Sequence, residues 1–336
     1  MRAVIIESKE NCAIRDIPEP EPSAAEVRVA VHYVGICGSD LHYYFDGANG
    51  AFRLKEGLIP GHELSGEIDY DPTGWFQPGT PVTVHPARVG EPVRGIEKRP
   101  NLWPGGSYLG SAATWPHTQG AMAEKIVIPR ENIIVLPPNL STQRAALAEP
   151  LGVAMHAMNL AGNMRGQRVV ITGAGAIGQL LMIAAKSYGA EEVTVTDIHD
   201  GALVRAKELG AEQVVNVTED VLPNEAFDIA FECTGVPAVL ESTFAALRRG
   251  GTQVQVGMLP DQPAGISLAP IVAKEINLVG AFRFNHEIKD AVFELERQPR
   301  YEQVVTHVFP VERTVEGFET ARNSQESGKV LIDFTR

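Results

Sequence analysis

The sequence predicts an α/β protein of two domains, the first rich in strands and the second an alternation of strands and helices. The chain has 336 residues, and a domain usually holds about 100–200 residues. Glycine and proline recur through residues 1–140, whereas short apolar strands and helical patterns alternate from residue 168 onward. Such alternation is typical of a parallel sheet with helices on both faces.

The composition is that of an ordinary globular protein, with 44% hydrophobic and 21% charged residues. The net charge of −13 disfavours nucleic acid and anionic membranes as partners. Three cysteines (Cys12, Cys37 and Cys233) form no disulfide framework, which favours a reducing compartment. The first apolar run is too short for a signal peptide, and no apolar run is long enough to span a membrane. We therefore expect a cytoplasmic protein.

The first segment carries the pattern of short strands and turns. Valines alternate with polar residues over 24–34, which predicts a half-buried strand. The frequent glycines and prolines that follow favour strands and turns over helices. Residues 86–110 form a long loop rich in Pro, Gly and Arg, and such loops are usually functional or flexible.

The second segment begins near residue 141, where Ser141 is a suitable N-cap for a helix. A final strand over 329–334 is expected to rejoin the first domain. Between these points the apolar patterns predict strands over 169–172, 193–196, 214–215, 228–232, 252–256 and 276–281, and helices over 177–188, 202–209 and 286–297.

A glycine-rich turn follows the first strand of this alternation. Residues 173–178 match the pattern G-x-G-x-x-G between a predicted strand and a predicted helix. Gly173 allows a tight turn, Gly175 lets the backbone approach a pyrophosphate, and Gly178 allows close packing of helix on strand. Ile177 lies within the same turn and is counted with this predicted cofactor site. The alternative is a glycine-rich turn without a ligand.

An acidic residue follows at the spacing that a ribose-binding carboxylate needs. Asp197 ends the next predicted strand, 19 residues after Gly178. Its carboxylate would accept hydrogen bonds from the ribose hydroxyls and repel a 2′-phosphate. The first basic residue after it is Arg205. Both features predict NAD as the cofactor rather than NADP.

A second group of residues has the chemistry of a metal site. Cys37 is followed 25 residues later by the pair His62-Glu63. A thiolate, an imidazole and a carboxylate are suitable zinc ligands. Taken singly, a lone cysteine or histidine more often occupies a position in the core.

The residues around these ligands resemble a known family. The stretch Val34–Tyr44 and the triplet Gly61–Glu63 resemble the zinc signature of the medium-chain alcohol and polyol dehydrogenases. The blocks Ala148–Leu151 and Gly280–Phe284 resemble later blocks of its polyol branch, in the expected order. The resemblance covers essentially the whole chain.

This resemblance implies a fold and an activity. The implied architecture is a GroES-like, β-rich catalytic domain (residues 1–147 and 284–336) with a Rossmann domain that binds NAD (residues 148–283). The implied activity is oxidation of a secondary hydroxyl with zinc and NAD. The similarity is greatest to the branch that oxidises the sugar acid L-idonate, and next to the branch that oxidises sorbitol.

The resemblance also implies roles for individual residues. Cys37, His62 and Glu63 would bind zinc, and Glu149 would bind it directly or through water. Asp40 would be the carboxylate that orients the ring of His62.

Further residues would move the proton and bind the substrate. Ser39 would take the substrate proton and His42 would pass it on, although His42 could equally be a surface histidine. Arg283 would bind the carboxylate of a sugar acid, while Tyr43 and Phe284 would contact the substrate or, for Tyr43, pack in the core. Weaker candidates for the carboxylate are Arg53, Lys55 and His117, each of which could instead be a surface charge.

One departure from the family pattern limits the metal content. Many relatives hold a second, structural zinc with four cysteines in the segment that corresponds to residues 86–110, where this chain has none. We therefore predict one zinc per chain and no structural zinc. A homodimer or homotetramer is expected from the family.

Two alternatives stay open at this stage. One is a dehydrogenase of neutral polyols such as sorbitol or xylitol. The other is a protein that binds NAD without catalysis, as a sensor or a structural protein, which loss of the metal ligands would have favoured.

Overall fold

The computed structural model describes residues 1–335, and the chain divides into two compact units. The first unit comprises Met1–Glu149, Ile288–Asn323 and the C-terminal segment from Lys329, and the second comprises Pro150–Glu287 and Ser324–Gly328. The sequence placed residues 284–287 and 324–328 in the first domain, whereas the structure places them in the second unit, where they form hydrogen bonds with His156 and Arg205, respectively. The sequence also placed residues 148–149 in the second domain, and the structure places them in the first unit.

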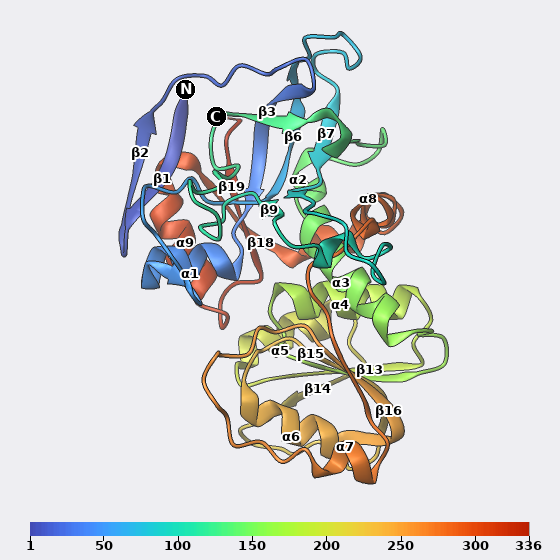
Figure 1. The fold of residues 1–336 in the computed structure, drawn as a ribbon. Helices are drawn as coiled ribbons and strands as arrows, with labels where there is room; N and C mark the ends of the chain where they lie inside the picture. The colour runs from blue at the N-terminus through green and yellow to red at the C-terminus, as the bar shows by residue number, and fades with distance from the viewer. Residues whose placement is uncertain (336) are drawn as a thin grey trace. The chain divides into compact units, whose positions relative to one another are not determined.

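The first unit is built around a mainly antiparallel sheet (Figure 1). Its strand order is β11-β7-β6-β3-β19-β18, and β10 also pairs with β3. The central strand β3 contains Val27, Val29 and Val31, each at most 3% exposed, so the predicted alternation is confirmed. The strands of this unit are β1 (Arg2–Ser8), β2 (Asn11–Asp16), β3 (Glu26–Gly35), β4 (Ala48–Asn49), β5 (Phe52–Arg53), β6 (Glu63–Tyr70), β7 (Pro81–Val84), β8 (Ala87–Arg88), β9 (Ser107–Tyr108), β10 (Lys125–Pro129), β11 (Ile133–Val135), β18 (Val305–Pro310) and β19 (Lys329–Asp333).

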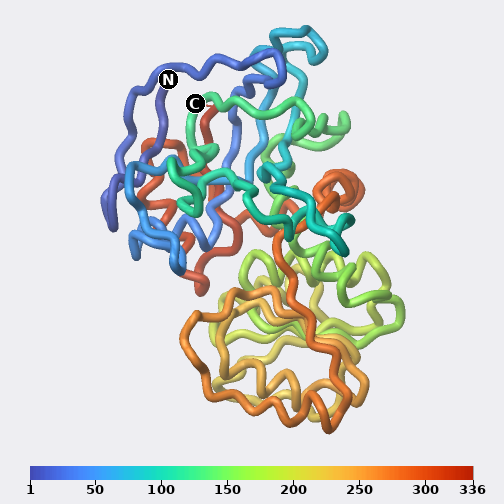
Figure 2. Tube along the Cα trace, in the orientation of Figure 1, coloured from blue at the N-terminus to red at the C-terminus, as the bar shows by residue number. Residues whose placement is uncertain are grey.

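The last strand returns to the first ones, as the sequence predicts. β19 pairs antiparallel with β3 and parallel with β18, and Figure 2 shows this red segment beside the blue N-terminal part of the chain. The C-terminal strand thus joins the same sheet as β3, which brings residues from distant parts of the sequence to one place.

A helix lies where the sequence predicted only strands and turns. Helix α1 (Gly38–Asp46) begins after Cys37, whose backbone N–H donates to the side chain of Asp40 at 2.9 Å. It ends at Gly47, which has a φ of 69°. The many glycines and prolines of residues 1–140 favoured strands and turns, whereas the capping contact of Asp40 and the left-handed Gly47 start and end a helix here. The other helices are α2 (Thr142–Ala145), α8 (Glu287–Arg297) and α9 (Thr314–Arg322), with 3₁₀ turns at Pro100–Leu102, Arg130–Asn132, Pro299–Val304 and Val311–Arg313.

The second unit contains a parallel sheet of order β14-β13-β12-β15-β16-β17. Counted along the chain this order is 3-2-1-4-5-6, which defines a doubly wound sheet whose order reverses between β12 and β15. Helices α6 and α7 cover the face drawn below the sheet in Figure 1, and α4 covers the opposite face. Ligands of such sheets bind at the carboxyl ends of the strands beside the reversal.

The predicted elements of this unit are confirmed, and α6 and α7 are additional. Ser141 caps α2 by accepting a hydrogen bond from the backbone of Arg144, as the sequence predicts. The elements are α3 (Ala148–Ala161), β12 (Arg168–Thr172), α4 (Ala176–Ser187), β13 (Glu192–Asp197), α5 (Asp200–Glu208), β14 (Gln213–Asn216), β15 (Phe227–Glu232), α6 (Pro237–Ala246), β16 (Leu247–Gln255), α7 (Ala269–Ala273) and β17 (Asn277–Gly280). Over residues 1–335 no helix is long and apolar enough to cross a membrane.

Candidate metal centre and dinucleotide site

Two neighbouring strands of the first unit bring the candidate metal ligands together. Cys37 stands between β3 and α1, and His62 directly precedes Glu63, the first residue of β6. The pairing of β3 with β6 sets Gly35 opposite Glu63, so the end of one strand lies beside the start of the other. The ligand atoms of Cys37, His62 and Glu63 all lie within 4.8 Å of one another.

Asp40 joins the two ligand segments through their backbones. Its side chain is fully buried and accepts hydrogen bonds from the backbone N–H groups of Cys37 and Gly61, both at 2.9 Å. The sequence predicted that this carboxylate orients the ring of His62. Within the described part of the chain, however, Nδ1 of His62 is buried without a hydrogen-bond partner. Asp40 thus fixes the backbone on either side of the ligands and acts on His62 through its charge.

The carboxylate of Glu63 is held by a lysine that the sequence analysis did not single out. Lys329 donates from Nζ to both carboxylate oxygens of Glu63, at 2.7 and 2.6 Å, and to the carbonyl of Ile36 at 3.0 Å. Both side chains are buried. The available signal was a lysine at the start of an apolar strand, since a buried lysine almost always has a partner.

Glu149 has a different partner, which the sequence analysis also missed. The hydroxyl of Tyr108 donates to Oε1 of Glu149 at 2.5 Å, and both residues are buried. The ring of Tyr108 also meets the ring of His62 edge-on, with centroids 5.3 Å apart. No sequence pattern marks this tyrosine, because it comes from the irregular segment 86–110.

The charges around the cluster favour a bound cation. Burial lowers the pKa of His62, but the thiolate of Cys37 and the carboxylates of Glu149 and Asp40 outweigh burial and raise this pKa to about 10. Burial also raises the pKa of the carboxyl groups of Asp40 and Glu149. Such shifts arise where negative groups crowd a site of low dielectric constant. A divalent cation at this place would relieve the crowding.

The residues present fit a zinc ion. Thiolate, imidazole and carboxylate are the ligands that zinc prefers in proteins. A buried ring nitrogen without a partner, as on His62, is costly unless another group satisfies the ring.

Ser39 and His42 lie on the first turns of α1, shortly after Cys37. Ser39 is half-buried, whereas the side chain of His42 is 60% exposed and lies 3.0 Å from a carboxylate oxygen of Asp46. This placement suits the predicted order of a proton relay, from a half-buried hydroxyl to an imidazole in contact with solvent. The relay itself stays a prediction.

Two of the residues predicted to contact substrate are packed in the core instead. Tyr43 is 1% exposed, and its hydroxyl accepts a hydrogen bond from the backbone of Ala112 at 2.9 Å. Phe284 is 2% exposed. The structure therefore gives both side chains packing roles. Arg283 is half-buried, has a φ of 53° and lies with its guanidinium 4.8 Å from the ring centroid of Phe282.

The three weaker candidates for a carboxylate differ in their surroundings. His117 accepts the backbone N–H of Lys55 on Nε2 at 2.9 Å, and its Nδ1 lies 3.0 Å from the carbonyl of Thr114. Both ring nitrogens of His117 are thus already engaged by backbone groups. Arg53 and Lys55 are exposed.

The glycine-rich turn of the second unit has the geometry that its sequence predicts. Gly173 follows β12 with a φ of 95°, a conformation that glycine favours. A Cβ on Gly178 would lie 1.9 Å from the carbonyl oxygen of Gly173, so the turn needs glycine there. Gly175 is the N-cap of α4, and Ile177 is half-buried on its first turn. The free N–H groups at this helix start can bind a phosphate.

Asp197 stands at the end of β13 beside this turn. One carboxylate oxygen accepts the backbone N–H of Ala174 at 2.8 Å, and the other accepts those of Ile198 and His199 at 2.8 and 3.0 Å. The carboxylate is thereby fixed next to the glycine turn, where a ribose-binding acid is expected.

A second carboxylate, Glu232, is buried beside the glycine turn and was not predicted from the sequence. Glu232 ends β15 and accepts hydrogen bonds from the backbone of Thr234 and Gly235, at 2.6 and 3.0 Å, and from the side chain of Gln255. A Cβ on Gly173 would lie 3.0 Å from Cγ2 of Thr234. Glu232 thus fixes a loop that touches the glycine turn. An acid at the end of an apolar strand was the signal for it.

Comparison with known families identifies the class of protein. A family described as zinc-binding dehydrogenase matches residues 176–297, and one described as alcohol dehydrogenase GroES-like domain matches residues 23–138. The chain belongs to the zinc-binding dehydrogenases and is an oxidoreductase of that family. The predicted fold class, a GroES-like domain with a Rossmann sheet, is confirmed.

Individual relatives narrow the family further. The chain is 34% identical over 264 residues to L-idonate 5-dehydrogenase (NAD(P)(+)) of Escherichia coli (strain K12). The aligned region covers 77% of this chain and 77% of the relative. It is 32% identical over 345 residues to sorbitol dehydrogenase of Gallus gallus, which covers 98% of this chain and 95% of the relative. The solved structure of L-idonate 5-dehydrogenase from Escherichia coli matches with a TM-score of 0.93 at 29% identity and covers 99% of this chain and 97% of the other.

Proposed function

We propose that this chain is a zinc-dependent, NAD-linked dehydrogenase that oxidises a secondary hydroxyl of a sugar acid, converting L-idonate to 5-ketogluconate. The observation that carries the proposal is the cluster of half-buried Cys37 with buried His62 and Glu63, and with the charge of Glu149 acting on His62. Similarity to L-idonate 5-dehydrogenase in both sequence and structure supports the substrate.

Different residues of the chain bind the metal, transfer the proton and bind the cofactor in this proposed reaction. Cys37 and His62, with Glu63 or Glu149, would hold zinc, which supplies a Lewis acid that lowers the pKa of the substrate hydroxyl. Ser39 takes the hydroxyl proton, and His42 passes it to solvent. The N–H groups of the turn at 173–178 and the carboxylate of Asp197 hold the cofactor.

The surroundings of Asp197 support NAD over NADP. Its carboxylate repels the 2′-phosphate by which NADP differs from NAD. The nearest following cation, Arg205, donates from its guanidinium to the carbonyls of Ser324, Gln325 and Ser327. These bonds commit Arg205 to the backbone, so it does not offer a phosphate site.

A second candidate substrate is a neutral polyol. Sorbitol dehydrogenase of Gallus gallus matches nearly the whole chain. A sugar acid differs from a polyol by one negative charge, for which we propose Arg283, with exposed Arg53 and Lys55 as further candidates. A protein without catalysis is disfavoured, since all the candidate zinc ligands are present. The cytoplasmic location and the homodimer or homotetramer remain proposals.

The test is a set of initial rates of NAD reduction by the purified zinc-loaded protein on L-idonate, D-sorbitol and xylitol. The proposal predicts the highest kcat/KM on L-idonate, and a tenfold or greater loss of it on substitution of Arg283 by methionine. Equal or better rates on the neutral polyols would assign the chain to the polyol alternative. No rate on any of the three would reject both substrates.

A further inference from the structure

The two buried glutamates of the metal centre are restrained in different ways. Both oxygens of Glu63 accept from the ammonium group of Lys329. Glu149 instead accepts one hydrogen bond, from the neutral hydroxyl of Tyr108 to Oε1. Over the described residues, its Oε2 receives no hydrogen bond. Glu149 therefore has one oxygen restrained and one oxygen available to a ligand.

Tyr108 contacts two residues of the metal centre, one through its ring and one through its hydroxyl. Its ring packs edge-on against the ring of His62, and its hydroxyl reaches Glu149. The side chain is 6% exposed. Ring packing limits rotation of the tyrosine, so the hydroxyl is presented to Glu149 in a fixed direction.

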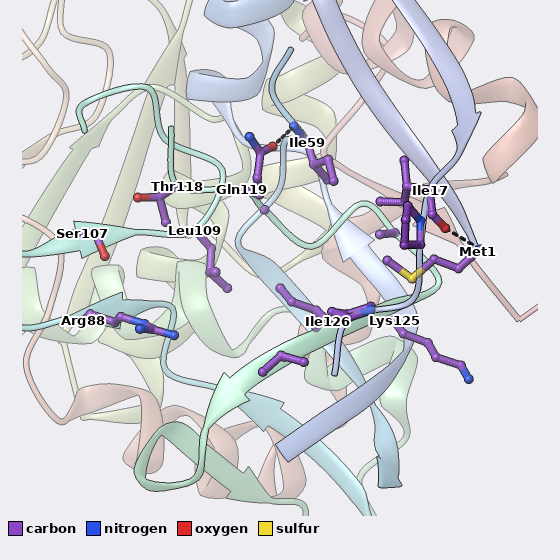
Figure 3. A pocket seen from close by; sticks show the side chains of 15 residues that line it. Met1, Ile17, Ile59, Arg88, Ser107, Leu109, Thr118, Gln119, Lys125 and Ile126 are labelled. Carbon is purple, nitrogen blue, oxygen red and sulfur yellow. Dashed lines mark hydrogen bonds between the residues drawn. The ribbon is translucent and has the colours of Figure 1, made fainter. Parts of the chain in front are cut away.

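The neighbours of Tyr108 explain why it points inward. Ser107 and Leu109, on either side of it, line a cavity of about 450 Å³ in the first unit (Figure 3). Successive side chains of an extended segment point to opposite sides, so Tyr108 points away from this cavity and toward the cluster. Ile59 and Gln119 line the same cavity and are joined by a hydrogen bond of 2.6 Å.

Segment 86–110, which carries Tyr108, is long and irregular, but hydrogen bonds connect its two ends. Strand β9 pairs with β8, which sets Tyr108 opposite Ala87. The side chain of Asn132 donates to the carbonyls of His85 and Ala87, both at 2.7 Å. The backbone of Leu109 donates to the carbonyl of Pro86 at 3.1 Å. These bonds place Tyr108 independently of the rest of the segment.

From these contacts, and resting on the proposed zinc site, we infer that Tyr108 is a positioning residue of the metal centre. Its hydroxyl holds Oε1 of Glu149, so that Glu149 presents Oε2 to the metal. Segment 86–110 has no cysteine. It thereby contributes Tyr108, which orients Glu149, to the catalytic metal centre.

Substitution of Tyr108 by phenylalanine tests this role, because it removes the hydroxyl and keeps the ring against His62. Zinc affinity is measured by competition with a chromophoric chelator, and the ligand field by the visible absorption of the Co²⁺-substituted protein. We expect Y108F to bind zinc about 10–100-fold more weakly, the range found for residues that orient metal ligands, and to shift the Co²⁺ bands. Y301F is the matched control, because Tyr301 is also buried and its hydroxyl lies 3.4 Å from Glu294.

A double substitution shows whether Tyr108 acts through Glu149. In an E149A background, Y108F should leave zinc affinity and the Co²⁺ spectrum unchanged. An equal loss of affinity in both backgrounds, or no loss in either, overturns the inference about Tyr108 while the zinc site stands. If the parent protein binds no zinc that substitution of Cys37 removes, the proposed function fails instead.

Discussion

At the scale of single residues, the site combines ligands that the sequence could predict with partners that it could not. Cys37, His62 and Glu63 lie in short local motifs, and the resemblance of these motifs to a zinc signature made them candidate ligands. Lys329 is 266 positions from the carboxylate that it holds, and Tyr108 is 41 positions from Glu149. Contacts between such distant residues depend on the pairing of β19 with β3 and of β9 with β8. The return of the last strand to the first domain was expected, but no local pattern encodes the residue register of either pairing.

Substitution of Cys37 by serine tests the metal cluster. We expect loss of bound zinc and a fall in kcat of about 10³-fold or more, since a Lewis acid contributes several kcal/mol and about 1.4 kcal/mol is a factor of ten. NADH binding, followed by its fluorescence, should be unchanged. C12S is the matched control and should keep its zinc, because burial raises the pKa of Cys12 to about 12 and makes it a poor ligand. Full zinc content in C37S would refute the cluster.

Substitution of Lys329 by methionine tests the buried ion pair. Removing the ammonium group leaves the carboxylate of Glu63 buried and uncompensated, which should lower the free energy of unfolding by about 3–5 kcal/mol. Urea unfolding of the metal-depleted protein measures this loss. E63Q should restore part of the stability in K329M. Losses that simply add in the double variant would mean that the two side chains do not act as a pair.

At the scale of elements, the parallel unit was predicted more completely than the strand-rich unit. Its strands are short apolar runs, and α4 and α5 repeat at 3.6-residue spacing, so these elements are visible locally, whereas α6 and α7 were not predicted. In the first unit, α1 was missed because the recurring glycines and prolines of residues 1–140 favoured strands and turns, whereas Asp40 and Gly47 start and end a helix there. That error concerns the site directly, since α1 carries Ser39, Asp40 and His42.

We expect Asp197, at the end of β13, to determine whether NAD or NADP binds. Substitution of Asp197 by serine removes the charge that repels a 2′-phosphate, so the ratio of kcat/KM for NAD over NADP should fall about 10–100-fold, corresponding to a hydrogen bond to a charged group. Steady-state kinetics with both cofactors measure the ratio. E208Q, which removes an exposed carboxylate from α5, should leave it unchanged. A ratio unaffected by D197S would show that Asp197 does not select the cofactor.

Glu287, the first residue of α8, should make the free energy of unfolding depend on pH. Burial raises the pKa of Glu287, but hydrogen bonds from His156 and the backbone of Asn285 outweigh burial and lower it from 4.5 to about 2. The ionised form is therefore favoured by folding, and this stabilisation is present above pH 4.5 and lost as the pH falls toward 2.

Substitution of Glu287 by glutamine should lower the free energy of unfolding at pH 7 by about 1–3 kcal/mol. It should also flatten the dependence of the melting temperature on pH between 4.5 and 2. D290N removes an exposed carboxylate from the same helix and should change neither. A parallel pH dependence in E287Q and the parent protein would contradict the shift.

At the scale of the whole molecule, the chain crosses between its two units more often than the sequence suggested. The segment 324–328 belongs to the second unit, although β19 and α9 on either side of it belong to the first. Three backbone carbonyls of this segment accept hydrogen bonds from Arg205. A short polar segment has no pattern that reveals such a partner, whereas the overall two-domain division was visible in the change of periodicity near residue 141.

The metal content is also a property of the whole chain. Segment 86–110 lacks the cysteines of a structural zinc site, and among residues 1–335 the cluster of metal-ligating side chains is the one at Cys37, His62 and Glu63. We therefore expect one functional zinc for each chain.

Removal and restoration of zinc test whether a zinc ion at Cys37, His62 and Glu63 is required for activity. The protein is depleted of metal with a chelator, and NAD reduction on L-idonate and on sorbitol is followed while zinc is added back in known amounts. We expect activity to be absent in the depleted protein, to rise as zinc is added and to saturate at one zinc per chain. Full activity in the depleted protein would contradict a catalytic role for zinc at this cluster.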